Sequence, residues 1–144
     1  MGSWRRVARG PGRSARPLSR LVAGGARFGV VGITGVLVNS LILLLAHGIA
    51  GLPLLLASPL AVEVAILHNY LWNDRWTFRS QGFSALRLAK FNLASLGGMV
   101  VASGTLYLLA ERWGFPYLLA NLVGVAAASI LNFSASLLWI WGSE

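Results

Sequence analysis

The chain has 144 residues, of which 56% are hydrophobic and only 11% are charged. Soluble domains carry about 25% charged residues, so this sequence has too few polar side chains to coat a water-soluble protein, which argues against a soluble enzyme. It has no cysteine and only two histidines, so it predicts no disulfide, no metal centre and no cofactor.

The net charge of +8 comes mainly from one end of the chain. Residues 1–27 contain seven arginines and no acidic residue, whereas the remainder has five basic and four acidic residues. We expect residues 1–26 to form a disordered, arginine-rich cytoplasmic tail that lies on anionic phospholipids. The charge therefore predicts membrane contact and no nucleic-acid partner.

Four charge-poor windows predict an all-α integral membrane protein with four transmembrane helices. One span needs about 20 apolar residues, and the predicted spans are residues 28–46, 54–72, 91–110 and 117–139. The breaks between the spans contain Gly-x-Pro turns at 51–53 and 114–116, which end helices.

The basic residues predict the orientation in the membrane. The segment between the second and third spans carries Arg75, Arg79, Arg87 and Lys90, whereas the two short loops carry only Arg112 between them. Because cytoplasmic loops are enriched in Lys and Arg, we expect both termini and this segment to be cytoplasmic.

An internal repeat divides the chain in two. The segment 27–81 aligns with 90–144 without a gap, and 16 of 55 positions are identical. The chain is thus predicted to hold two parallel two-helix repeats, 27–81 and 90–144, joined by a cytoplasmic linker at 82–89. Small residues around Gly35 and Gly98 predict a face on which the two halves pack together.

Glu63 lies near the middle of the second predicted span. An ionised carboxylate at this depth costs at least a few kcal/mol, so it faces a partner, a wet cavity, or is protonated. Glu63 is a candidate for binding sugar hydroxyls or for coupling protons to transport. The alternative is a neutral Glu63 bonded to Asn39 or Thr34 of a neighbouring helix.

Further polar residues in the spans must point into the bundle, because lipid offers no hydrogen bonds. Asn69 and Asn73 share a helix face, while Asn39 and Asn132 lie in the first and fourth spans. These asparagines either hold helices together or line a sugar-binding groove, and the residues alone do not decide between the two. For His68, packing as a neutral side chain is favoured over a proton relay.

The second span ends in Asp74-Arg75-Trp76. Arg75, Arg79, Arg87 and Lys90 are candidates for holding a lipid phosphate, since Arg offers paired N–H donors. Topology alone also accounts for their number. The position of Asp74 next to Arg75 predicts a local ion pair, and Trp76 belongs at the membrane boundary.

These residues resemble a known family. The chain is similar to the GtrA-like family over about 27–141. Two motifs carry the resemblance, Arg27-Phe28-x-x-x-Gly32-x-x-Gly35-x-x-x-Asn39 and Glu63-x-x-x-x-His68-Asn69-Tyr70-x-x-Asn73-Asp74-Arg75-Trp76-Thr77-Phe78. The resemblance implies a four-helix protein of the bacterial cell membrane, associated with cell-surface polysaccharide synthesis. The second repeat lacks the Asp-Arg pair, so any phosphate-binding role falls on Arg75 and its neighbours.

Three functions are open on this basis. The first is a non-enzymatic translocase of polyprenyl-phosphate-linked sugars, whose polar path follows Asn39, Glu63, Asn69 and Asn132. The second is a non-transporting adaptor for a membrane glycosyltransferase, and the third is a proton-coupled small-molecule exporter. Four spans make a small bundle, so a homodimer that shelters the sugar is also left open.

Overall fold

The computed structural model describes residues 18–142, apart from the side chain of Tyr117, and this part of the chain contains helices and no strand. The four helices are α1 (Leu18–Leu43), α2 (Leu54–Trp72), α3 (Ala85–Tyr107) and α4 (Tyr117–Ala135). Each continues into a short π-helical turn: η1 (Leu44–Ile49), η2 (Asn73–Thr77), η3 (Leu108–Arg112) and η4 (Ser136–Ile140). All four are long and apolar enough to cross a membrane, which confirms the predicted all-α fold with four candidate spans.

Two helices begin earlier than predicted. α1 begins at Leu18. Residues 18–26, which the sequence assigns to a disordered tail, are therefore helical. Their Leu, Arg and Ala side chains favour helix. Residues 1–17, the rest of that predicted tail, lie outside the described residues. α3 begins at Ala85, inside the predicted linker, because the Ser84 hydroxyl accepts a hydrogen bond from the Arg87 amide and caps the helix.

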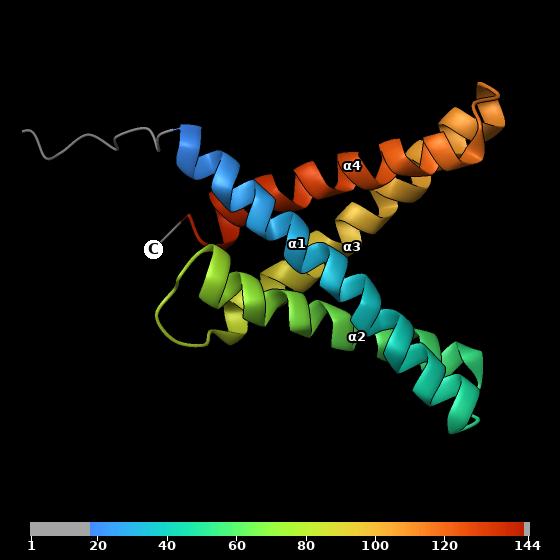
Figure 1. Ribbon diagram of the computed structural model, residues 1–144, viewed down its shortest axis with the longest axis horizontal. Helices are drawn as coiled ribbons and strands as arrows, with labels where there is room; N and C mark the ends of the chain where they lie inside the picture. Colours follow the sequence, from blue (N-terminus) through green and yellow to red (C-terminus); the bar gives the residue numbers. More distant parts are fainter. Residues whose placement is uncertain (1–17, 143–144) are drawn as a thin grey trace, which may run out of the picture.

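The helices form two hairpins, α1–α2 and α3–α4, that meet at one end and diverge toward their tips (Figure 1). The start of α1, the α2–α3 connection and the end of η4 lie together at the shared end, which we call the junction. Most helix packing therefore lies within each hairpin rather than between the hairpins.

Aromatic rings hold the hairpins together at the junction. Tyr70 is fully buried and stacks against Trp141, which in turn lies parallel to Phe78 with ring centroids 4.2 Å apart. Phe28 of α1 contacts Phe133 of α4 at 5.4 Å between centroids. Buried rings contribute large apolar areas, so the core lies at the junction and leaves the tips separate.

A glycine–asparagine contact closes each hairpin. A methyl group on Gly98 would lie 2.6 Å from both amide atoms of Asn132, and one on Gly35 would overlap the side chain of Asn69 in the same way. These contacts join α1 to α2 and α3 to α4. The prediction that the small-residue faces pack the two halves together is wrong, because each glycine receives the asparagine of its own hairpin.

Several features recur at equivalent positions of the two aligned segments. The bounds of α2 coincide with those of α4 when 27–81 is aligned with 90–144. Both tip loops contain a glycine with positive φ, Gly51 at 71° and Gly114 at 70°. These are correspondences that a repeat predicts; the parallel placement of its halves in a membrane stays a prediction.

Candidate functional site

A basic cavity of about 600 Å³ opens at the junction. Its polar lining consists of Arg20, Arg27, Thr77 and Arg79, and its apolar lining includes Phe78 and Phe133, together with Leu21 and Leu137. The lining contains three guanidinium groups and no carboxylate. We call this cavity the arginine pocket.

Local structure places the three arginines. Arg20 and Arg27 are two helical turns apart on α1, so they share one face of the helix. The Arg27 guanidinium lies 5.8 Å from the centre of the Trp76 ring, within the range of a cation–π contact. Arg79 follows η2 with φ of 53°, a left-handed conformation typical of a residue just past a helix end, and this turn brings it to the pocket.

The lining of the arginine pocket has groups suited to an anion beside an apolar wall. Guanidinium groups donate paired hydrogen bonds to phosphate oxygens, and the aromatic and aliphatic lining fits a hydrocarbon chain attached to the anion. Arg79 was predicted as a phosphate ligand from the sequence, whereas Arg20 and Arg27 were counted with the tail. Their heptad spacing in an apolar segment was the signal that could have identified them.

Asp74 lies at the centre of a buried polar network beside the arginine pocket. Its carboxylate is 3.2 Å from Arg87 Nε, with both side chains at most 7% exposed. It also accepts hydrogen bonds from Trp141 Nε1 at 2.9 Å and from the Ser80 hydroxyl. The network joins η2, α3 and the end of the chain.

The predicted ion pair between Asp74 and Arg75 is wrong. Arg75 is exposed and lines a small cavity with Trp72 and Trp76, because consecutive helical residues point in different directions. Arg87, a candidate phosphate ligand, is instead buried against Asp74 and donates to the Gly82 carbonyl.

Lys90, on α3, contacts Trp139 within its own hairpin. Its ammonium group is 5.5 Å from the Trp139 ring and donates to the Trp139 carbonyl at 3.4 Å. In the alignment of the two segments, the Lys90–Trp139 contact is the equivalent of the Arg27–Trp76 contact. Of the four predicted phosphate ligands, only Arg79 lines the arginine pocket.

Glu63 is exposed on α2 and accepts a hydrogen bond from Asn92 Nδ2 of α3 at 2.8 Å. The alternative that the sequence left open, a neutral Glu63 bonded to Asn39 or Thr34, named the wrong partners. Thr34 instead lies 3.0 Å from His68 Nε2, which fits the packed histidine that the sequence favoured. The Asn92–Glu63 bond joins the two hairpins, a pairing that depends on how they cross.

The remaining predicted asparagines have buried side-chain atoms. Asn73 is 1% exposed and accepts a hydrogen bond from Thr77. The side-chain oxygens of Asn39, Asn69 and Asn132 are buried and have no hydrogen-bond partner among the described residues. Asn69 and Asn132 lie in different hairpins, and the continuous polar path through them stays a prediction.

Comparisons with known proteins agree with this architecture. Residues 27–141 match the GtrA/DPMS transmembrane domain. The chain is 43% identical over 101 residues to a dolichol-phosphate mannosyltransferase of Pyrococcus furiosus, which covers 69% of this chain and 28% of that protein. It is also 28% identical over 124 residues to the uncharacterized membrane protein YngA of Bacillus subtilis, which covers 82% of this chain and 79% of that protein.

The chain thus spans little more than a quarter of the length of the mannosyltransferase that it matches. The match to the domain family covers residues 27–141, and so includes most of the two hairpins, the aromatic junction and the Asp74 network. The resemblance drawn from the sequence motifs is confirmed, and the chain belongs to the GtrA/DPMS transmembrane-domain family.

Proposed function

We propose that this protein binds polyprenyl-phosphate-linked sugars at the junction and passes their head groups across the membrane. Under the predicted topology the junction faces the cytoplasm of a bacterial cell, where the basic tail contacts anionic phospholipids. The lipid chain remains in the bilayer throughout. The protein performs no covalent step in this scheme.

The arginine pocket is the observation that carries this proposal. A polyprenyl-phosphate sugar is a phosphodiester with one negative charge between an apolar chain and a polar sugar. The pocket offers three guanidinium groups for the phosphate and an aromatic and aliphatic wall for the first carbons of the chain. The similarity to part of a dolichol-phosphate mannosyltransferase supports a ligand of this class.

The same similarity favours a second candidate function. A mannosyltransferase that contains a segment 43% identical to this chain suggests an adaptor that holds a lipid-linked sugar, or the enzyme that uses it, at the membrane. An adaptor of this kind binds the lipid in the arginine pocket and moves nothing. Reconstitution separates the two functions, because only the translocase moves the lipid when no other protein is present.

Removing one guanidinium from the arginine pocket tests the binding site. We expect Arg20→Gln and Arg79→Gln each to weaken binding of a polyprenyl-phosphate hexose in nanodiscs about tenfold, since a hydrogen bond to a charged group contributes about 1.5–3 kcal/mol. Arg112→Gln is the matched control, because Arg112 is also exposed but lies in η3 at a hairpin tip. Equal affinities for all three variants would contradict the proposed function.

Neutralising Glu63 tests the membrane path. In Glu63→Gln the side chain still accepts the Asn92 hydrogen bond but carries no charge. We expect the transbilayer movement of the lipid-linked hexose in liposomes to fall at least about tenfold, since a charge at this depth is costly and is retained for function. Binding to the arginine pocket is expected to be unchanged.

Asn92→Ala is the control, because it breaks the hydrogen bond and keeps the carboxylate. If Glu63→Gln moves the lipid at the wild-type rate, the carboxylate has no role in translocation. If the unmodified protein binds the lipid but does not move it, the adaptor function replaces the translocase.

A further inference from the structure

A second cavity, mostly apolar but with three polar side chains in its lining, lies at the tip of the α3–α4 hairpin. Its volume is about 540 Å³, within the range of about 300–1,000 Å³ of small-molecule sites. Ser103, Glu111 and Asn121 supply its polar groups, and its apolar lining includes Leu106 and Leu118. We call this cavity the tip pocket.

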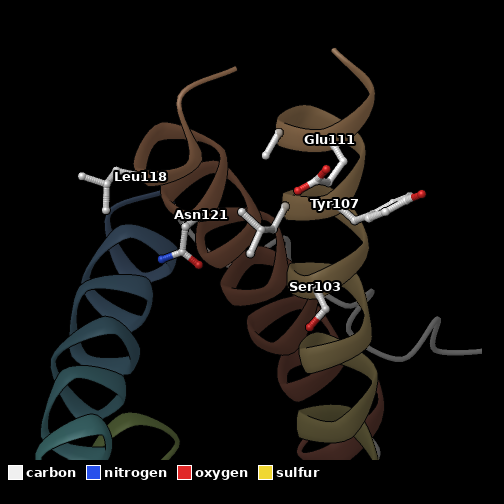
Figure 2. A pocket seen from close by; sticks show the side chains of 7 residues that line it. Ser103, Tyr107, Glu111, Leu118 and Asn121 are labelled. Atoms are coloured by element: carbon white, nitrogen blue, oxygen red, sulfur yellow. The ribbon is translucent and has the colours of Figure 1, made fainter. Parts of the chain in front are cut away.

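Figure 2 shows how the polar groups are arranged. The oxygen atoms of Ser103 and Glu111 turn toward α4, whereas the ring of Tyr107 points away from it. Within the described part of the chain, the side chains of Ser103, Glu111 and Asn121 make no hydrogen bond and no ion pair. Their hydrogen-bonding groups are therefore available to a ligand.

The other hairpin tip lacks this chemistry. In the alignment of 27–81 with 90–144, Glu111 corresponds to Gly48 and Asn121 to Ser58, while Ser103 corresponds to Ser40. At these positions only the α3–α4 tip carries a carboxylate and an amide, although the two hairpins share the glycine–asparagine contact and the loop geometry. Helix formation and hairpin packing do not require them.

The tip pocket is too far from the arginine pocket to hold the same head group at the same time. Helix α3 has 23 residues, which at about 1.5 Å per residue gives about 34 Å, close to the thickness of a bilayer core. Under the predicted topology, a ligand in the tip pocket occupies a separate site at the opposite side of the membrane.

We propose that the tip pocket binds the sugar head group of the lipid-linked sugar on the far side of the membrane. Sugar hydroxyls both donate and accept hydrogen bonds. The Glu111 carboxylate accepts them, while Ser103 and Asn121 do both. Leu106 and Leu118 cover the apolar C–H face of the ring. This inference rests on the proposed function and adds a second site to it.

Photocrosslinking tests this site. The full chain is reconstituted in liposomes with a polyprenyl-phosphate hexose that carries a diazirine on the sugar, and the labelled peptides are identified by mass spectrometry. We expect labelling of residues 103–121 to exceed that of residues 40–58, the equivalent tip, by at least about tenfold, the effect of one charged hydrogen bond. Equal labelling of the two tips in the unmodified protein would overturn the inference without any variant.

Variants then assign the labelling to side chains. Glu111→Gln and Asn121→Ala are expected to reduce labelling of residues 103–121 about tenfold, whereas Ser58→Ala, the matched control in the other hairpin, leaves it unchanged. Unchanged labelling in both pocket variants overturns the inference. The inference is also overturned if tetraethylammonium competes with the labelling and free hexose does not, because that result indicates a cation site. Arginine-dependent binding at the junction reports on the proposed function separately, so the two failures are distinguishable.

Discussion

Replacing Asp74 by Ala is expected to lower the free energy of unfolding by about 3–5 kcal/mol, the usual cost of removing one partner from a buried ion pair. The Arg87 side chain is buried, with 5% of the residue exposed, so without the carboxylate its charge remains buried beside the aromatic junction. Trp141 Nε1 and the Ser80 hydroxyl also lose their acceptor. The measurement is unfolding by SDS titration of the protein in mixed micelles.

Arg75→Ala is the matched control for this substitution. Arg75 is the sequence neighbour of Asp74 but is exposed, and exposed substitutions change stability by about 0.5 kcal/mol or less. In the double variant Asp74→Ala with Arg87→Leu, part of the loss is expected to return, because the guanidinium charge is no longer buried in the junction. If Asp74→Ala and Arg75→Ala unfold alike, the network does not stabilise the junction.

Adding one methyl group at Gly98 is expected to destabilise the second hairpin by about 1–3 kcal/mol, the range found for overpacked cores. The new Cβ in Gly98→Ala lies 2.6 Å from both amide atoms of Asn132, so either the asparagine or the helix must move. Gly35→Ala is expected to act in the same way through Asn69. The same SDS titration measures both effects.

Gly97→Ala is the control for the methyl group itself. A Cβ at Gly97 meets no atom within 4 Å, and alanine favours helix over glycine by about 1 kcal/mol. Gly97→Ala is therefore expected to be neutral or stabilising, although it changes the adjacent residue. A loss of stability in Gly97→Ala as large as in Gly98→Ala would show that the asparagine contact is not the cause.

Much of the fold follows from the sequence, since a helix depends on bonds between residues one turn apart and on the run of apolar side chains. Residues 54–72 were predicted as one span and form α2 with those bounds. The pattern of apolar residues does not indicate where α1 and α3 begin, because charged residues lie in the first turns of both helices. Arginine in the first turns of a helix is compatible with both helix and membrane boundary.

The candidate site was only partly predictable. The sequence named Arg79 as a candidate phosphate ligand, and Arg79 lines the arginine pocket. It did not join Arg20 and Arg27 to Arg79, because Arg20 was assigned to a disordered tail and Arg27 was counted with the charge of that tail. It recognised that Glu63 needs a partner and named residues of α1, whereas Asn92 of α3 supplies the hydrogen bond. In both cases the missing information was which helix faces meet.

The sequence by itself determined that this is a four-span membrane protein with a basic end and an internal similarity between its halves, because apolar length, charge and residue order are local properties of the chain. Only the tertiary structure decided that Asp74 pairs with Arg87 rather than Arg75, and that three arginines line one cavity. Ion pairs and pockets form between residues that packing brings together. Here the aromatic junction fixes that packing, since it holds the two hairpins at one end and leaves their tips apart.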